Sequence, residues 1–422
     1  MKANCFIVLF LLSTFYLKAQ DTTKVLFLGN SFTYYNNMPD LVKGLADSAG
    51  IVTEMEMYAP GGMYVYTTTS MTGHDSSAVT ESYIYSKDWD YIVVQDNQGG
   101  YVWSQGYINS MIVNGNVVLY DKIKNYNQCT RIVYFAGWAM EGGLPSSYWN
   151  DGGLNITSET TQSCIARIYN QYVHLNNTLF NEIVTPIGLA WNTCLNTYPS
   201  VELHGPDGVH SSLAGSYLAA STIFSTIFKT DPTNFNFNGG LNDTLATYLR
   251  QTGYNTVITD SVFFATNLNE YTPEIIFNPD EISGPDNYSS YQWVLDNNIL
   301  LGADTNPYIV NTSGSYYLIA TDVDGCWHRS FNLYCTPLFS SLAKEEIYEY
   351  EIYPNPAKDY LIIWTNSREN SILYLYDNLG SLHKTALINN DYRLDISDLE
   401  PGIYYLKINN TSQFAKKIIV AE

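Results

Sequence analysis

The chain has 422 residues, which is enough for more than one domain, and its 45% content of hydrophobic residues supplies ample core material. The formal charge of −21 argues against nucleic acid and anionic lipid surfaces as partners, because both are bound through clusters of Lys and Arg. The 37 tyrosines suit wet, sugar-binding surfaces, but we favour the simpler interpretation that their rings serve packing in a secreted protein.

The amino-terminal stretch has the pattern of a secretory signal peptide. Lys2 precedes an apolar run that is too short to span a bilayer, and cleavage is expected after Ala19 or Gln20. We therefore expect residues 1–20 to be removed. No later segment is long and apolar enough to cross a membrane, so the sequence predicts an exported mature chain without a transmembrane segment.

Five cysteines follow the signal peptide: Cys129, Cys164, Cys194, Cys326 and Cys335. Cys326 and Cys335 are close in the sequence, and in an exported protein they could bridge neighbouring strands. The three earlier cysteines lie in the first domain, and because their number is odd, at least one of them has no disulfide partner within that domain. No group of cysteines has metal-ligand spacing, so we expect no zinc site, no other metal and no cofactor.

Residues 24 to about 230 alternate between apolar strands and amphipathic helices. Pro39 suits the first turn of a helix, Ser211 or Ser212 can cap the last one, and Pro186 indicates an end or an edge of its strand. Alternation of this kind predicts a parallel sheet covered by helices on both sides. A further helical stretch at 241–249 closes this domain. The expected strands are 25–28, 55–59, 90–95, 131–136 and 182–189, and the expected helices are 39–49, 161–173 and 213–228.

The pattern changes after Pro273 to short alternating strands separated by Asp, Asn and Gly turns. This pattern predicts a small β-sandwich, and the segment from about residue 351 repeats it as a second one. The expected strands are 291–294, 307–310 and 314–320 in the first unit, and 360–365, 371–376, 402–408 and 416–420 in the second.

Ser31 follows the apolar run at 25–28 and a Gly29-Asn30 turn, at the edge of the sheet where open α/β folds place their ligands. A serine nucleophile needs a base, and the base needs an orienting group. His210 is the best candidate for the base, because Asp207 lies three residues before it and can hold its imidazole. The other histidines are weaker candidates: His204 is near the site, His74 could reach the substrate, His174 suits a structural role, and His328 and His383 lie in the β-units.

An oxyanion needs hydrogen-bond donors, which glycine turns supply because no side chain blocks their backbone N–H groups. The candidates are the backbone N–H groups of Ser31 and Gly62, with Gly61 as the near alternative to Gly62, and a side-chain amide from Gln95 or Asn97. Four large aromatic residues shape the substrate cleft or pack in the core: Tyr101, Trp103, Trp138 and Trp191.

These motifs together resemble the SGNH (GDSL-type) hydrolases over about residues 24–230. The residues that carry the resemblance are Gly29-Asn30-Ser31-Phe32-Thr33, Gly61-Gly62, the strand at 90–95, Pro186-Ile187-Gly188-Leu189-Ala190-Trp191 and Asp207-Gly208-Val209-His210. The resemblance implies a flavodoxin-like three-layer α/β/α sandwich and hydrolysis of carboxyl esters. It further implies that Ser31 is the nucleophile, His210 the base, Asp207 its partner and Gly62 an oxyanion donor.

The chain departs from the family pattern in two places. Gln95-Asp96-Asn97-Gln98-Gly99-Gly100 replaces the usual Gly-x-Asn-Asp block, and the first motif reads Gly-Asn-Ser rather than Gly-Asp-Ser. Gln95 resembles the glutamine of a subset of the family that reads Leu-Gln-Glu at this position and shares the Gly-Asn-Ser motif. The resemblance therefore implies that the Gln95 side chain is the third oxyanion donor, and Asn97 is the second candidate for that role.

Two further resemblances cover the carboxyl-terminal part of the chain. Tyr291-Gln292-Trp293, Gly314-Ser315-Tyr316-Tyr317 and Asp324-Gly325-Cys326 are similar to an immunoglobulin-like module of bacterial surface proteins. The last segment is similar to the sorting domain of type IX secretion, through Tyr353-Pro354-Asn355-Pro356-Ala357, Leu375-Tyr376-Asp377 with Gly380, Leu399, Pro401-Gly402, Tyr404 and Lys416-Lys417-Ile418. This similarity implies transport across an outer membrane by the type IX machinery, followed by release or surface attachment and removal of the sorting domain.

We therefore expect a signal peptide at 1–20, a hydrolase domain at 21–271, an immunoglobulin-like β-sandwich at 272–340 and a sorting domain at 341–422. The expected function is that of a secreted serine esterase that removes short acyl groups from small molecules or polysaccharides. The alternative is a non-catalytic adhesin or glycan-binding protein on a hydrolase fold. A peptidase is the weaker third possibility, because the sequence contains no evident peptide-binding feature.

Overall fold

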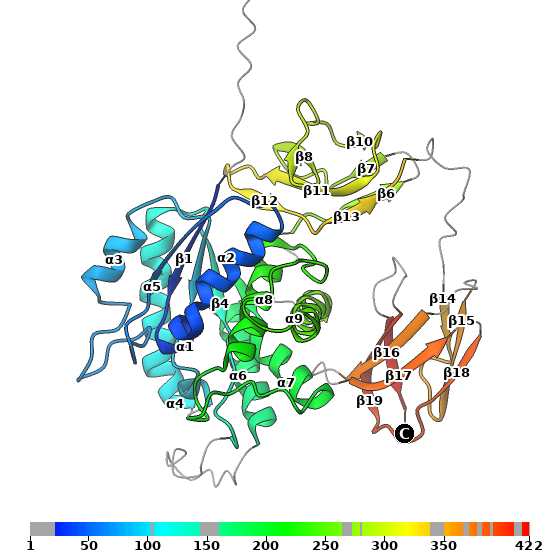
Figure 1. Cartoon of the computed structure of the whole chain (residues 1–422), viewed down its shortest axis with the longest axis horizontal. Coiled ribbons are helices and arrows are strands. Elements are labelled where there is room, and N and C mark those ends of the chain that lie inside the picture. Colours follow the sequence, from blue (N-terminus) through cyan, green and yellow to red (C-terminus); the bar gives the residue numbers. More distant parts are fainter. Residues whose placement is uncertain are drawn as a thin grey trace, which may run out of the picture.

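The computed structural model describes residues 22–102, 105–143, 160–263, 272–278, 281–337, 350–365, 371–377, 382–388, 391–408 and 416–421. The expected signal peptide, Trp103 and Gly380 lie outside these ranges. Figure 1 shows an α/β domain followed by two all-β units. No helix within the described ranges has the length and apolar character that crossing a membrane requires.

The α/β domain is built on a parallel sheet of five strands in the order β2-β1-β3-β4-β5. This is the flavodoxin-like strand order, and it confirms the predicted fold. The strands are β1 (Thr23–Leu28), β2 (Thr53–Tyr58), β3 (Tyr91–Val94), β4 (Arg131–Phe135) and β5 (Ile183–Thr185). The last four residues of β1 and all of β3 are buried, because a parallel sheet is covered on both faces.

Two groups of helices cover the sheet. On one side α2 (Met38–Ser48), α8 (Leu213–Phe228) and α9 (Asp243–Phe263) pack against one another, together with α7 (Ile187–Thr197). The sheet separates them from α3 (Ala78–Ile84), which packs against α5 (Asn114–Tyr126) (Figure 1). The other α-helices within the described ranges are α1 (Ser31–Tyr34), α4 (Gln105–Tyr107) and α6 (Thr161–Leu175).

The expected strand at 182–189 is wrong in its second half. The strand ends at Thr185, Pro186 caps α7, and the helix begins at Ile187. Pro186 has no N–H to donate to the sheet, so pairing stops there. The backbone of Gly188 packs closely against that of Gly137. A Cβ on Gly188 would lie 2.4 Å from the Gly137 carbonyl oxygen, so a larger residue does not fit there.

The second unit is a β-sandwich, as predicted. One sheet has the order β10-β7-β6, and the other has the order β12-β11-β8-β9 with β13 paired to β11. Trp293, Tyr316 and Leu318 are fully buried between them. The strands are β6 (Ile276–Asn278), β7 (Glu281–Ser283), β8 (Ser290–Leu295), β9 (Asn298–Ile299), β10 (Tyr308–Ile309), β11 (Gly314–Thr321), β12 (Trp327–Arg329) and β13 (Leu333–Cys335).

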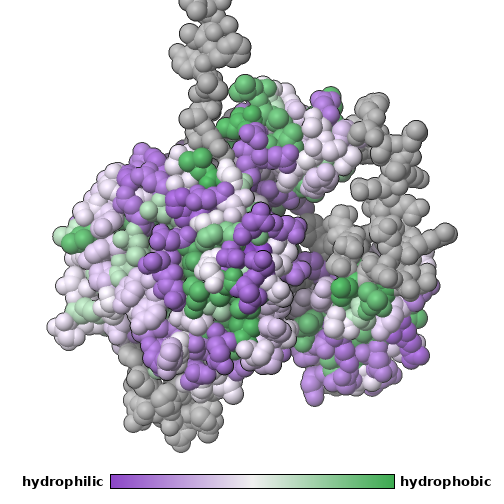
Figure 2. Space-filling view, viewed as in Figure 1, coloured by the Kyte–Doolittle hydropathy of each residue, from purple (hydrophilic) through white to green (hydrophobic). Residues whose placement is uncertain are grey.

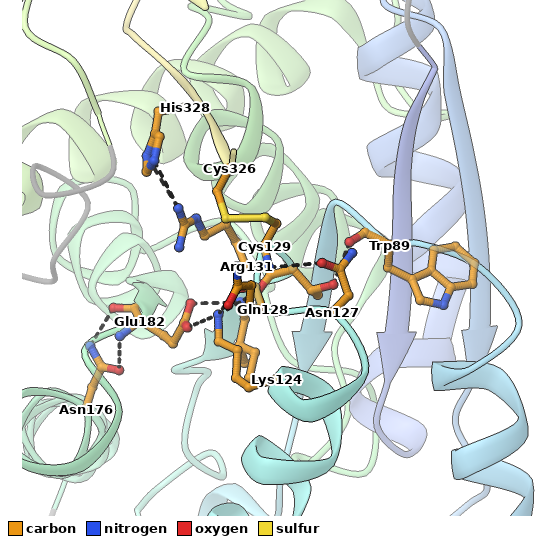
Figure 3. Close-up of polar contacts among 12 residues, drawn as sticks. Trp89, Lys124, Asn127, Gln128, Cys129, Arg131, Asn176, Glu182, Cys326 and His328 are labelled. Carbon is orange, nitrogen blue, oxygen red and sulfur yellow. Dashed lines mark hydrogen bonds and ion pairs between the residues drawn. A yellow bond between two sulfur atoms is a disulfide. The ribbon is translucent and has the colours of Figure 1, made fainter. Parts of the chain in front are cut away.

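Cys326 and Cys335 do not form the disulfide that their spacing in the sequence left open. Cys335 lies opposite Gly314 at one end of β11, whereas Trp327, next to Cys326, lies opposite Thr321 at the other end. Seven residues of extended strand span roughly 23 Å, which is far beyond the reach of a disulfide. Cys326 instead bonds to Cys129 of the α/β domain (Figure 3).

The disulfide is part of a junction between the first β-sandwich and the α/β domain. Cys129 precedes β4, and Asp90, which precedes β3, accepts a hydrogen bond from the Trp327 indole at 3.1 Å. Arg131 points toward the His328 ring (Figure 3), and its guanidinium lies 3.2 Å from Nε2. The first β-sandwich therefore sits at the amino-terminal ends of the parallel strands, opposite the edge that carries Ser31.

The surface of this β-sandwich carries exposed apolar side chains. Leu301 and Ile309 are 82% and 61% exposed, and Figure 2 shows hydrophobic residues gathered on the outer part of the unit.

The third unit is the second predicted β-sandwich, with sheets in the orders β14-β15-β18 and β17-β16-β19-β20. Leu361, Leu373 and Leu406 are buried in a core of its own. The strands are β14 (Tyr350–Tyr353), β15 (Tyr360–Thr365), β16 (Ser371–Asp377), β17 (Leu382–Ile388), β18 (Tyr392–Asp395), β19 (Gly402–Ile408) and β20 (Lys416–Val420).

Candidate active site

Ser31 stands on a tight turn at the carboxyl end of β1. The Asn30 side chain caps α1 by accepting a hydrogen bond from the Phe32 N–H at 3.1 Å, which makes Ser31 the first residue of that helix. Gly29 is required before it, because a Cβ there would lie 2.3 Å from the Thr33 hydroxyl. The Ser31 side chain is left half-buried at the edge of the sheet.

His210 and Asp207 meet Ser31 across 176 or more residues of sequence. The His210 ring lies with Nε2 2.8 Å from Ser31 Oγ and with Nδ1 2.6 Å from Asp207 Oδ2. The other carboxylate oxygen of Asp207 accepts hydrogen bonds from the backbone N–H groups of Val209 and His210, at 3.0 and 2.9 Å. The structure thus brings the three predicted residues into one continuous hydrogen-bonded chain.

The charge on Asp207 determines the direction of these hydrogen bonds. The hydrogen bond from His210, together with those from the backbone N–H groups of Val209 and His210, lowers the pKa of Asp207 to about 2. The carboxylate is therefore ionised at any ordinary pH, so His210 Nδ1–H donates to it. Nε2 is then the acceptor that faces the Ser31 hydroxyl, which is the arrangement of a general base.

Two hydrogen bonds attach the loop that carries His210 to the α/β domain. Gly208 accepts a hydrogen bond from the Glu141 N–H at 2.8 Å, and the Trp138 indole donates to the Val209 carbonyl at 3.0 Å. Trp138 also stacks on Phe32 and on Trp191, with ring centroids 4.9 and 4.4 Å apart.

Of the aromatic residues considered for the substrate cleft, Tyr101, Trp138 and Trp191 are buried. They pack in the core and do not line a cleft.

The glycine turn lies beside the Ser31 turn. Asn30 Nδ2 donates to the Met63 carbonyl at 2.8 Å, which ties the two turns together. Gly62 has φ +73°, a conformation that favours glycine, and a Cβ on it would meet no atom within 4 Å. Among the described residues, none accepts a hydrogen bond from the Ser31 N–H. Both expected backbone donors therefore lie in suitable turns. Gly61 is also exposed there, with the Tyr34 hydroxyl 3.3 Å from where its Cβ would be.

Gln95 lies in a position that argues against the oxyanion role expected for it. Its side chain is fully buried beneath the nucleophile turn. Its Oε1 accepts hydrogen bonds from the Asn30 N–H at 2.8 Å and the Thr33 hydroxyl at 3.1 Å, and its Nε2 donates to the Asp96 carbonyl. Gln95 thus stabilises the turn that carries Ser31 through these hydrogen bonds.

Asn97 is half-buried, and its backbone N–H donates to Asp96 Oδ1 at 2.7 Å. It is the remaining side-chain candidate for the third donor.

Asp96 is a residue that sequence reasoning missed. Its buried carboxylate accepts hydrogen bonds from the N–H groups of Val65 and Asn97, at 2.8 and 2.7 Å, and longer ones from Tyr101 and Asn116. Burial raises its pKa. Asp96 joins the segment after the glycine turn to the loop after β3, so it fixes the spacing of the candidate oxyanion donors.

His74 does not reach the substrate, contrary to one expectation from the sequence. It is fully buried, its Nε2–H donates to the Gly29 carbonyl at 2.9 Å, and its Nδ1 accepts from the Thr80 hydroxyl at 2.9 Å. Burial lowers its pKa to about 4, so the ring is neutral at pH 7. His74 thus also stabilises the nucleophile turn.

The remaining histidines have other contacts, and His204 lies close to the loop of His210, with its backbone bridged to that of Ser211. His204 is buried, and its Nε2 lies 2.8 Å from the Ala139 carbonyl. His174 is exposed near the end of α6. His328 and His383 contact Asp322 and Asp377 within the β-units.

Comparison with known proteins gives one family match, over the last unit. Residues 351–421 match the model described as "Secretion system C-terminal sorting domain". These residues are a type IX sorting domain. The chain is accordingly an exported protein, secreted or held at the cell surface, and the type IX machinery is its partner in export. A search of curated proteins finds no match to this chain.

Three solved structures show partial similarity to the chain. A DUF4886 family protein from Bacteroides uniformis is 19% identical, with 56% of this chain and 95% of that one covered and a TM-score of 0.44. The M. smegmatis aryl esterase is 10% identical, with coverage of 49% and 99% and a TM-score of 0.34. A carbohydrate acetylesterase family member from Sinorhizobium meliloti is 14% identical, with coverage of 47% and 94% and a TM-score of 0.32.

Proposed function

We propose that this protein is a secreted serine esterase of the SGNH hydrolase type. The observation that carries the proposal is the hydrogen-bonded chain from Asp207 through His210 to Ser31, with His210 Nε2 2.8 Å from the Ser31 hydroxyl. A serine, a histidine and a carboxylate in this order recur on unrelated folds that perform acyl transfer, so geometry rather than sequence position supports the roles.

In the proposed reaction Ser31 Oγ attacks the ester carbonyl while His210 Nε2 takes the hydroxyl proton. The carbonyl oxygen becomes an oxyanion, which the N–H groups of Ser31 and Gly62 and the Asn97 amide hold. The ester C–O bond then breaks, and His210 returns the proton to the leaving alcohol. A water molecule activated by His210 hydrolyses the acyl-enzyme by the same steps in reverse. Loss of one oxyanion donor is expected to lower the rate about 10²–10³-fold.

The substrate we propose is a short acyl ester on a small molecule or a polysaccharide. The half-buried position of Ser31 at an open sheet edge supports access by a bulky alcohol. Export by the sorting domain supports substrates outside the cell. We also propose the division into units at 21–271, 272–340 and 341–422, with the disulfide holding the first two together.

The decisive experiment is labelling of the purified full-length protein with a fluorophosphonate probe, with hydrolysis of a chromogenic acetate ester measured in parallel. Labelling that is lost in both Ser31→Ala and His210→Ala is the expected result. A folded wild-type protein that neither labels nor hydrolyses the ester would instead support the alternative, a glycan-binding or adhesin protein on a hydrolase fold. Binding of the unlabelled protein to immobilised polysaccharides would then test that alternative.

A further inference from the structure

Tyr35 lies face to face with the proposed base. Its ring centroid is 3.9 Å from that of His210, and the two planes differ by only 4°. Phe32 lies near the same imidazole in a tilted arrangement, at 5.8 Å. His210 therefore has an aromatic face on one side and an aromatic neighbour on another, while its two ring nitrogens are engaged by Asp207 and Ser31.

Hydrogen bonds from Asn36, the residue after Tyr35, attach this segment to the one that follows His210. We call these hydrogen bonds to Ser211 and Ser216 the Asn36 clamp. Asn36 Nδ2 donates to the Ser211 carbonyl at 3.1 Å and to the Ser216 hydroxyl at 2.9 Å. The Ser216 hydroxyl also lies 3.3 Å from the Tyr35 carbonyl and 2.6 Å from Ser211 Oγ. Asn36 has φ +53°, a left-handed conformation that asparagine tolerates better than most residues.

These contacts give the two halves of the triad a second point of attachment. Ser31 and His210 come from segments 179 residues apart, and their one direct contact is a single hydrogen bond. The Asn36 clamp fixes the end of the nucleophile segment to the start of α8, directly behind His210. The stack of Tyr35 on His210 then fixes the plane of the imidazole, which can still tilt about the line that joins its two hydrogen bonds to Asp207 and Ser31.

An aromatic face also affects the charge of the ring that it covers. A cation over the face of a tyrosine is attracted by the negative face of the ring. In the proposed acylation step a neutral His210 takes the Ser31 proton and becomes an imidazolium, so this attraction is stronger in the transition state than before the proton is transferred. An interaction of that kind raises the rate of the chemical step rather than the affinity for substrate.

We propose that Tyr35 is a positioning residue for His210: its ring holds the imidazole plane in line with Ser31 and stabilises the imidazolium that forms during acylation. The proposal rests on the esterase function proposed above. It predicts that loss of the aromatic face slows acylation, whereas loss of the phenol hydroxyl alone does not.

The test compares Tyr35→Leu and Tyr35→Phe in the full-length protein, by the rate of inactivation by a fluorophosphonate at saturating and subsaturating concentrations. Tyr35→Leu should lower the maximal rate of inactivation about 5–30-fold with little change in the half-saturating concentration. Tyr35→Phe should restore the rate to within about threefold of wild type. Tyr85→Leu is the matched control, because it removes another half-exposed tyrosine, whose ring lies tilted against that of Tyr126 and away from the triad.

A spectroscopic signature accompanies the kinetics. The ring current of Tyr35 should shift the Hε1 resonance of ¹³C-labelled His210 upfield in the wild type and in Tyr35→Phe, and the shift should vanish in Tyr35→Leu. A purely structural role would lower the thermal stability of Tyr35→Leu without this kinetic pattern and without rescue by phenylalanine.

The outcomes separate the two proposals. A labelled wild type with a Tyr35→Leu variant that reacts equally fast overturns the role of Tyr35 and leaves the esterase standing. An unlabelled wild type overturns the esterase and this role with it. If Tyr35→Leu does not fold, Asn36→Gly decides, because glycine keeps the left-handed backbone while removing the clamp. A rate about 3–10-fold below wild type supports the proposal, and an unchanged rate contradicts it.

Discussion

His74 makes the stability of the α/β domain depend on pH in a way that can be measured. Its ring is fully buried between the Gly29 carbonyl and the Thr80 hydroxyl, where it is held neutral. Protonation would turn Nδ1 into a donor, and Nδ1 now accepts a hydrogen bond from Thr80. It would also place a charge beneath the nucleophile turn, where the two ring nitrogens contact the Thr80 hydroxyl and the Gly29 carbonyl and, among the residues that the structure describes, no carboxylate.

The magnitude follows from the pKa of His74, which burial lowers from 6.5 to about 4. Because the folded pKa is the lower one, the unfolded chain binds more protons between pH 6.5 and pH 4, and stability falls as the pH falls through this window. The stabilisation is complete above pH 6.5. The loss amounts to about 2 kcal/mol between pH 7.5 and pH 5.0, and to about 3 kcal/mol once the pH is below 4.

The assay is urea unfolding of the full-length protein and of His74→Gln at pH 7.5 and pH 5.0, followed by tryptophan fluorescence. Wild type should lose about 2 kcal/mol more than the variant between the two pH values. Other titrating groups, such as Asp96, are common to both proteins and cancel in the difference. Equal losses in the two proteins would refute the assignment of this pH dependence to His74.

Two further predictions concern Gln95 and the disulfide. Gln95→Leu leaves the buried Asn30 N–H and Thr33 hydroxyl without their acceptor, so the free energy of unfolding should fall by about 2–4 kcal/mol. Asn97→Ala should instead lower the rate of fluorophosphonate labelling about 10²–10³-fold, with little loss of stability. The opposite pattern in urea unfolding and labelling would return the oxyanion role to Gln95. The double variant Cys129→Ser with Cys326→Ser opens a loop of 197 residues and should lose up to about 5 kcal/mol, yet label at the wild-type rate because the bond lies opposite Ser31. Slow labelling by a folded double variant, with Cys335→Ser unaffected, would show that the first β-sandwich acts on the site.

The sequence was sufficient for the fold because the fold depends on patterns that are local in the chain. Short apolar runs that end in turn residues, such as 25–28 and 90–95, favour interior strands, and strands that alternate with helices pair in parallel. The positions of Ser31, Asp207 and His210 were also predictable. A serine on the first turn and a histidine three residues after an aspartate are short motifs, and parallel strands bring their carboxyl ends to one edge.

The sequence pattern was therefore enough to predict a parallel sheet covered by helices, two β-sandwiches and the triad of Ser31, Asp207 and His210, whereas the flavodoxin-like order of the sheet came from the family resemblance. The pairing of Cys326 became clear only in the folded chain, because the register of β11 separates it from Cys335 by the length of a strand. The tertiary structure also decided that Gln95 and His74 face the buried side of the Ser31 turn and that the ring of Tyr35 covers His210. These facts depend on which way a side chain points and on what burial leaves within hydrogen-bonding reach. Residue type and spacing do not specify the direction of a side chain or its hydrogen-bond partners. They do specify the Gly29-Asn30-Ser31 turn.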